Sequence, residues 1–393
     1  MMDINAAPTK EKNRLAAIDA ARGFAIFGIF IVNIGAFSAP YFIYGGATAV
    51  WNSTADRYTQ ALIDMFFQAS FYTLFSLLFG FGIQLLKDRL VERNIRVSRF
   101  LAKRLTILVG FGVIHAFAIW HGDILLSYGL IGLLLLLFLK ASNTSLLAWG
   151  AALLGGSVGL LSLALYGTRS ALGGSNQLAI TQAITSYQSE SLITIWEQNY
   201  NDWMNANGGI GFFFLIMVLL PLFLFGMYIA RKRWLHEPEK HKTILRKLWL
   251  VSLIGFIGLK IGPYLVGNPL WLSYLQDNVG GTFSAIFYII SITFIAQRKI
   301  GQKIIQPFAA VGRMALTNYL MQSIICFILF YGIGFGLYGS IRPLAGVGMV
   351  LVVFIGQIFL SNWWLRRFRF GPFEWLWRSL TYGKRQPLRK LEG

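Results

Sequence analysis

Long apolar segments alternate with short polar ones along almost the whole chain of 393 residues. A helix that crosses a membrane needs about 20 mostly apolar residues. By this criterion the pattern predicts ten spans, at residues 15–38, 62–86, 104–120, 123–140, 145–166, 209–230, 244–266, 278–297, 314–336 and 344–365. The expected fold is therefore all-α, a polytopic membrane protein with one transmembrane domain.

Lys and Arg are distributed unevenly between the two sides that these spans define. If the N-terminus is cytoplasmic, 30 of the 35 basic residues fall on the cytoplasmic side and only Arg57, Arg169 and Arg342 lie in outer loops. Cytoplasmic loops of membrane proteins carry such an excess of bases. We therefore expect both termini in the cytoplasm. The net charge of +19 then reflects membrane orientation and not nucleic-acid binding.

Composition supports the same class of protein. The chain is 56% hydrophobic and 13% charged, whereas a soluble domain is about one quarter charged. The single cysteine, Cys326, predicts neither a disulfide nor a zinc site. The first apolar run is long and follows a polar leader without a small-residue cleavage site, so we expect no cleavable signal peptide.

Two polar segments lie outside the predicted spans. The outer loop 167–208 contains four aromatic residues among Ser, Asn and Gln, which suits a lid, an amphipathic surface helix or a solvated connector. The cytoplasmic tail 366–393 alternates aromatic and basic residues. Such a segment is expected to lie on anionic lipid headgroups.

The first span carries three polar residues along one face. Asp19 and Arg22 are three positions apart and can form an ion pair on a helix. Asn33 falls roughly on the same face about 21 Å further along. These residues have two interpretations, a site for a ligand or a buried ion pair with an interhelical hydrogen bond. Gly23 in the same helix allows close approach of a neighbour.

The stretch from Arg104 to Tyr128 reads as two apolar helices joined by a very short turn. His115 lies eleven residues after Arg104, close to the expected midplane of the membrane. Histidine exchanges a proton near neutral pH, and a dry bundle favours the neutral imidazole that a general base requires. His115 is therefore a candidate base, with a satisfied core histidine as the alternative.

The turn of this hairpin contains His121 and Asp123. Asp123 is placed to cap the helix that follows. It is also placed to orient an imidazole, the pairing found in many catalytic sites. Both roles are open on the sequence alone.

Other polar residues within spans have weaker patterns. Lys260 stands near a Gly/Pro interruption, and Asp64 stands at the expected outer start of its span. Arg313 marks the cytoplasmic mouth of another span, and Asn318 follows it one turn in, to bind a ligand or to join helices. The chain contains no P-loop, nucleophile-elbow or zincin motif, which argues against those three enzyme classes.

Several motifs resemble the YeiB-like family of bacterial inner-membrane proteins. The resemblance covers the chain from Arg14 to about Arg385 and implies a bacterial cytoplasmic membrane. It rests on the runs RLAAIDAARGFAIFGIFIVNI, FYTLFSLLFGFGIQ, GFGVIHAFAIWHGDILLSYGLIGLL, VGRMALTNYLMQS and GPFEWLWRSLTYGKRQP.

The first span is also similar, more distantly, to the opening helix of two groups of transmembrane acyltransferases, the acyltransferase-3 group and the heparan-glucosaminide N-acetyltransferase group. Both groups take acyl-coenzyme A at the cytoplasmic face and deliver the acyl group to an acceptor outside. In the first group a histidine stands where this chain has Asn33, and in the second the active histidine falls at the position of Tyr44. Either His115 or His121 supplies the imidazole here, or this branch lacks the transfer chemistry.

The resemblance implies a set of roles. Asp19, Arg22, Arg104, Arg313 and Asn318 are the candidates for binding coenzyme A, and His115, Asp123, Asn33 and His121 those for catalysis. We thus expect an acyltransferase that uses acyl-coenzyme A as donor and needs no metal. A transporter or flippase for a small molecule or lipid-linked precursor is the alternative, and a non-catalytic membrane partner is a third. Expected partners are membrane lipids, the donor and an outer acceptor; homo-oligomerisation is open.

Overall fold

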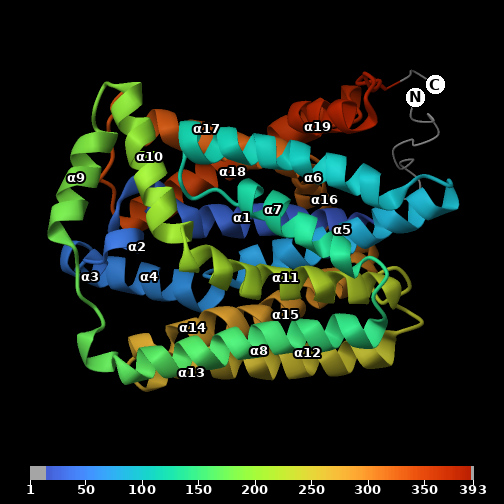
Figure 1. Ribbon diagram of the computed structural model, residues 1–393, viewed down its shortest axis with the longest axis horizontal. Coiled ribbons are helices and arrows are strands. Elements are labelled where there is room, and N and C mark those ends of the chain that lie inside the picture. The colour runs from blue at the N-terminus through green and yellow to red at the C-terminus, as the bar shows by residue number, and fades with distance from the viewer. Residues whose placement is uncertain (1–14, 391–393) are drawn as a thin grey trace.

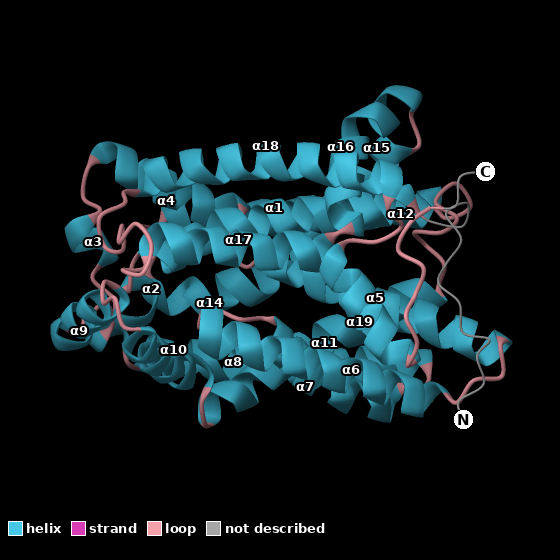
Figure 2. Ribbon diagram, turned by 90° about the horizontal axis from the view of Figure 1, so that it is seen from above, coloured by secondary structure: helices cyan, strands magenta, loops and turns pink. Residues whose placement is uncertain are grey.

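The computed structural model describes residues 15–390. The polar leader, where no cleavable signal peptide is expected, lies outside the described residues, as do the last three residues of the tail. The regular elements of the described part of the chain are all helices, and one isolated β-bridge joins Phe368 and Arg389. The long helices run side by side along one common direction (Figures 1 and 2). The predicted all-α class is confirmed.

The bundle consists of long helices with shorter helices at its ends and at interruptions. The long helices are α1 (Ala16–Ser38), α5 (Ser70–Glu92), α6 (Val97–Ile114), α8 (Asn143–Gly167), α11 (Ile210–Arg231), α12 (Lys242–Phe256), α15 (Gly281–Ala296), α16 (Lys299–Arg313), α17 (Ala315–Phe330) and α18 (Pro343–Arg367). The shorter α-helices are α2 (Tyr41–Tyr44), α3 (Ala47–Val50), α4 (Thr54–Phe66), α7 (Leu125–Leu135), α9 (Gln177–Tyr187), α10 (Leu192–Asn207), α13 (Gly262–Leu265), α14 (Ser273–Leu275) and α19 (Pro372–Tyr382). Three π-helices are η2 (His115–Ile119), η5 (Ile257–Ile261) and η7 (Gln276–Gly280), and three 3₁₀ turns are η3 (Leu136–Phe138), η4 (Arg169–Ala171) and η6 (Leu270–Leu272).

Eight helical segments among the described residues are long and apolar enough to cross a membrane, and α16 with α17 adds a ninth if this bent pair is one span. The predicted span 314–336 is thus the second half of a pair bent by 76°. The predicted span 123–140 is the shorter apolar helix Leu125–Phe138. It falls short of about 20 residues because the chain leaves helical geometry at Trp120 and resumes it only at Leu125. The ten predicted segments therefore correspond to eight full-length spans, one half of the bent pair and one shorter helix.

The two ends of the bundle differ in structure. At one end, called the α9 end below, α2, α3, α9 and α10 gather around the end of α1 (Figure 1). At the other, called the α19 end, lie α19 and the connection from α5 to α6 (Figure 1). Which end faces the cytoplasm remains a prediction from the basic residues.

Glycines bring neighbouring helices into backbone contact at two crossings. A Cβ added at Gly23 of α1 would overlap the carbonyl oxygen of Phe308 in α16. A Cβ at Gly80 of α5 would overlap that of Phe223 in α11, and one at Gly226 of α11 would overlap that of Leu77. Small residues permit such close approach in membranes, as expected for Gly23.

The two polar segments outside the spans both fold onto the bundle. Segment 167–208 forms α9 and α10 instead of an irregular loop. The tail forms α19, where Trp377 donates a 2.9 Å hydrogen bond to the carbonyl oxygen of Arg104 in α6. Leu376 and Leu380 of α19 remain exposed. Contact of the tail with lipid headgroups remains a prediction for that exposed face.

Candidate functional site

His115 stands at the point where α6 changes into the π-helix η2. A single π-helical turn inside a helix often marks a functional position. The histidine is fully buried. Its Nδ1 lies 2.7 Å from Oδ1 of Asp123, and its Nε2 lies 2.8 Å from Oγ of Ser323 in α17. Three side chains from three segments therefore form one continuous chain of hydrogen bonds.

Asp123 explains how the imidazole is oriented. Its second oxygen, Oδ2, accepts a 2.5 Å hydrogen bond from the backbone N–H of Leu126 at the start of α7. The carboxylate thus caps the helix and faces His115, so both roles that the sequence left open are present. An ionised carboxylate only accepts hydrogen bonds. Nδ1 of His115 must therefore carry the proton, which leaves the lone pair of Nε2 directed at Ser323.

Ser323 completes the arrangement, and sequence reasoning did not select it. Its hydroxyl has two acceptors in reach, Nε2 of His115 at 2.8 Å and the carbonyl oxygen of Tyr319 at 3.3 Å. The nearer acceptor is the imidazole. The order of the three groups and the two hydrogen-bond distances between them match a Ser–His–Asp triad. Such a triad is recognised by its geometry and not by sequence position. The available signal was the polar face that Tyr319 and Ser323 share, four residues apart in α17.

Asn318 lies one turn before this serine and joins helices. Its Nδ2 donates to Ser361 of α18 at 3.0 Å and to the carbonyl oxygen of Val311 at 3.2 Å. Gln357 of α18 donates in return to the carbonyl oxygen of Asn318 at 2.8 Å. These bonds support the packing role that the sequence left open for Asn318.

His121 belongs to a different cluster, at the α9 end. Its Nδ1 lies 2.9 Å from the hydroxyl of Tyr187 in α9, and that hydroxyl donates to Asp202 of α10 at 2.8 Å. Tyr44 donates a 2.5 Å hydrogen bond to the other oxygen of Asp202. Burial lowers the pKa of His121, and the nearby Asp202 opposes this shift. His121 and Tyr44 thus both anchor the α9–α10 segment.

The α10 helix also covers the π-helix itself. Trp196 donates to the carbonyl oxygen of Ala118 at 3.1 Å, and Asn199 donates to that of Phe117 at 3.3 Å. A π-helix leaves some backbone acceptors without their usual partners. Side chains of α10 satisfy two of them, so α10 supports the segment that carries His115.

Asn33 is half-buried on α1 beside the buried residues Phe30 and Ile34. Among the described residues it takes no part in the hydrogen-bond chain of His115. The structure thus does not bring it to the Ser323–His115–Asp123 site.

Arginines gather at the α19 end. Asp19 and Arg22 form the expected ion pair, at 3.1 Å. The guanidinium of Arg104 lies over the ring of Trp377, 3.6 Å from its centre. Arg22, Arg89 and Arg378 all lie close enough to act electrostatically on Arg104. We call Arg22, Arg89, Arg104 and Arg378 the arginine cluster.

Two of these arginines, Arg89 and Arg378, were not singled out in the sequence. Arg313 ends α16 next to Gly312, which packs against the backbone of Asp19 in α1. The position of Arg313 is therefore near the Asp19–Arg22 pair.

Glu374 of α19 accepts hydrogen bonds from the backbone and hydroxyl of Thr317 in α17. Burial raises the pKa of Glu374, and these two bonds oppose the rise.

The fold and these clusters define a multi-pass, all-α membrane protein with a buried Ser–His–Asp chain in its interior. Comparison with known proteins places it more narrowly. A family model described as "Protein of unknown function (DUF418)" matches residues 229–384. The chain belongs to this YeiB-like family, as its motifs predicted.

Two relatives support this assignment over the whole length. The chain is 38% identical to the uncharacterised protein YxaH of Bacillus subtilis (strain 168), with 98% of each chain covered. It is 30% identical to the uncharacterised protein YeiB of Escherichia coli (strain K12), with 94% of this chain and 96% of that protein covered. Both relatives are bacterial, which favours a bacterial membrane as the location.

Proposed function

We propose that the protein is a transmembrane acyltransferase of the bacterial cytoplasmic membrane, which moves an acyl group from acyl-coenzyme A to an acceptor on the outer side. The observation that carries this proposal is the hydrogen-bond chain Ser323–His115–Asp123, with distances of 2.8 and 2.7 Å. A hydroxyl, a neutral imidazole and an orienting carboxylate in this order are the groups that acyl transfer requires.

The chemistry proceeds in two steps. Nε2 of His115 removes the proton of Ser323 as Oγ attacks the thioester carbonyl; the C–S bond breaks, and coenzyme A leaves as a thiol with that proton. In the second step a hydroxyl or amine of the acceptor gives its proton to Nε2 and takes the acyl group. Oγ of Ser323 then recovers the proton. Asp123 stabilises the imidazolium that forms in each step.

The arginine cluster is the proposed site for the phosphates of the donor. Guanidinium groups suit phosphate oxygens because they offer several fixed donors. Arg104 and His115 lie on one helix, eleven residues and about 16 Å apart. The flexible arm of coenzyme A separates its phosphates from its thioester by a distance of this order. One helix thus connects the donor site to the reacting groups.

An acyl group held on Ser323 also suits transfer across a membrane. The donor is cytoplasmic and the acceptor lies outside, so the two need not be bound at the same time. The serine is buried in the bundle and lies between the arginine cluster and the α9 end. It is placed to receive the acyl group from one side and release it to the other.

Two measurements on the purified protein test this function. We expect saturable binding of acetyl-coenzyme A by calorimetry, weakened by Arg22→Ala and not by Arg57→Ala, an exposed arginine at the α9 end. Without an acceptor, we expect mass spectrometry to find an acetyl group on Ser323. Ser323→Ala and His115→Ala should lack it, and Ser157→Ala, a buried serine bonded to the carbonyl of Leu154, should retain it.

The outcomes test the binding of the donor and the role of Ser323 separately. A folded sample that binds no acyl-coenzyme A contradicts the acyltransferase function altogether. Binding without acetylation of Ser323, in a sample that transfers acyl groups to added acceptors, contradicts only the role of the serine.

A second function, proton- or ion-coupled transport, is favoured by one specific observation. Lys260, Asp64 and Asp277 form an ionisable cluster within the spans, and two of them, Lys260 and Asp277, stand in π-turns. Transporters use such interrupted helices at their binding sites. Solute counterflow in vesicles without consumption of a thioester would favour transport over acyl transfer.

A further inference from the structure

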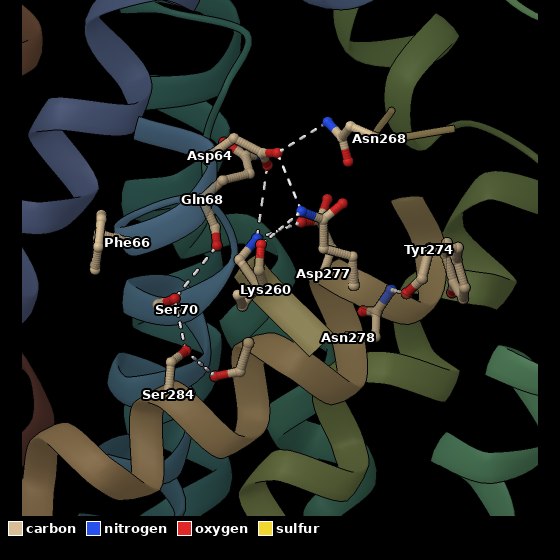
Figure 3. A network of polar contacts seen from close by, with 12 residues as sticks. Asp64, Phe66, Gln68, Ser70, Lys260, Asn268, Tyr274, Asp277, Asn278 and Ser284 are labelled. Carbon is tan, nitrogen blue, oxygen red and sulfur yellow. Dashed lines mark hydrogen bonds and ion pairs between the residues drawn. The ribbon is translucent and has the colours of Figure 1, made fainter. Parts of the chain in front are cut away.

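A second polar site surrounds Lys260 (Figure 3). It adjoins α13 and α14, which lie toward the α9 end of the bundle (Figure 1). Lys260 is fully buried in η5. Its Nζ lies 3.1 Å from Oδ1 of Asp277 in η7 and 3.6 Å from Oδ1 of Asp64 in α4. These three residues come from three different apolar spans. We call them the lysine cluster.

The charges of the lysine cluster do not balance when all three groups are ionised. One ammonium faces two carboxylates, which leaves one negative charge in excess. Ionisable groups inside a span are costly and usually serve a function. A buried lysine needs one carboxylate as counterion; the second is surplus and favours uptake of a cation, of which the proton is the smallest.

The two carboxylates are held very differently. Asp64 accepts from the hydroxyl of Tyr264 at 2.6 Å, from Gln276 at 3.2 Å and from Asn268 at 3.5 Å. Among the hydrogen bonds of the described residues, Lys260 supplies the donor to Asp277. Donors to a carboxylate stabilise its ionised form. Asp64 thus has three neutral donors besides Lys260, whereas Lys260 is the donor to Asp277, so a proton on Asp277 displaces fewer hydrogen bonds than one on Asp64.

Asp277 is also accessible. Its side chain is 29% exposed, whereas that of Lys260 is not exposed at all. A cavity of about 250 Å³ lies beside the cluster, lined by Gly258, Leu259, Gly262, Pro263 and Gln276 among others. Asp277 is therefore the partly exposed member of its ion pair with Lys260.

Hydrogen bonds and close packing hold the elements of the cluster together. Gln276 donates both to Asp64 and to the backbone carbonyl of Lys260, each at 3.2 Å, so it ties η7 to η5 and α4. Gly280 packs against the stem of Lys260, where a Cβ would lie 3.1 Å from its carbons. A proton on Asp277 weakens its bond to Nζ. The ammonium can then move towards Asp64, which is already within 3.6 Å.

We propose that the lysine cluster binds one exchangeable proton on Asp277, reached from the α9 end, and that its occupancy shifts Lys260 between the two carboxylates. Besides Lys260 and Asp64, the titratable groups near Asp277 are Tyr264 and Tyr72. Both are neutral phenols near neutral pH. This site does not depend on acyl transfer.

Infrared titration of the purified full-length protein tests the proposal. Relative to Asp277→Asn, the wild type should show one additional C=O band of a protonated carboxylic acid that disappears as the pH is raised, and should release one more proton per protein. Asp277→Asn should remove this band, because its amide still accepts from Lys260 but cannot ionise. Asp56→Asn, at an ion pair with Arg342 in the first turn of α4, is the matched control and should keep it.

A second variant keeps the test decisive if Asp277→Asn folds poorly. In Asp64→Asn, Asp277 becomes the sole counterion of Lys260, so its band should titrate at a lower pH than in the wild type. A band that persists in Asp277→Asn, or that does not move in Asp64→Asn, overturns the proposal. A titration whose midpoint shifts when sodium replaces choline also overturns it, because a metal cation would then occupy the site.

Discussion

Asp123 uses the two oxygens of one carboxylate for two purposes. One oxygen faces Nδ1 of His115, and the other accepts from the backbone N–H of Leu126. The first contact sets the tautomer of the imidazole, and the second holds the start of α7. A substitution at this residue can therefore separate chemistry from stability.

Asp123→Asn and Asp123→Ala should behave differently. The asparagine oxygen can still cap α7, but its NH₂ group would face Nδ1 and force the proton onto Nε2. We expect near-normal thermal stability and a loss of acyl transfer of roughly 10²- to 10⁴-fold, the range for a lost general base. Asp123→Ala should lose the activity and also about 1 kcal/mol of cap stabilisation.

Acylation rates and thermal unfolding in detergent distinguish the two variants. Equal activity in Asp123→Asn and the wild type would mean that the carboxylate serves only the helix.

At the scale of elements, interruptions and glycines decide how the helices meet. The π-turns η2, η5 and η7 occur where His115, Lys260 and Asp277 stand. Each π-turn therefore coincides with a polar side chain of one of the two sites. Gly80 and Gly226 hold α5 and α11 in backbone contact. The polar groups therefore lie in a bundle whose helix spacing is set by a few glycines.

Gly226→Ala tests this packing. The added Cβ would overlap the backbone of α5 at Leu77, and overpacking costs about 1–3 kcal/mol. We expect a clear fall in the thermal unfolding temperature in detergent. Gly159→Ala in α8, where a Cβ would meet nothing within 4 Å, should be neutral or stabilising, since alanine favours helix. Equal stability of the two variants would contradict close packing at Gly226.

At the scale of the whole molecule, the two ends carry different chemistry. The arginine cluster lies at the α19 end, whereas the tyrosine and aspartate cluster under α9 and α10 lies at the opposite end. The base distribution predicts that the α19 end faces the cytoplasm. That orientation would direct the arginine cluster to a cytoplasmic donor and the lysine cluster to the outer side.

Single cysteines test this orientation in intact cells. The natural Cys326 is buried and should not react with a membrane-impermeant maleimide. Ser175→Cys, exposed before α9, should be labelled from outside. Lys240→Cys, exposed in the turn before α12, should be labelled only after permeabilisation. The reverse pattern would place the α19 end outside.

Part of the site was predictable and part was not. His115 and Asp123 are eight residues apart on one hairpin, so a local pattern was enough to suggest their pairing. Ser323 is 208 residues from His115, and no local pattern links them. His121 looked equivalent to His115 in the sequence, yet its partners come from α9 and α10.

The sequence by itself determined the all-α membrane class, the family, most spans and the asymmetry of the basic residues. These properties depend on the local balance of apolar and charged residues, which each segment carries by itself. Only the tertiary structure decided which polar groups meet: Ser323 with His115, Asp64 with Lys260, and Arg89 and Arg378 with Arg104. Such contacts between side chains depend on how each helix is rotated about its axis and how far it lies from its neighbours. Glycine contacts between distant segments, together with the π-turns and the 76° bend between α16 and α17, set that geometry.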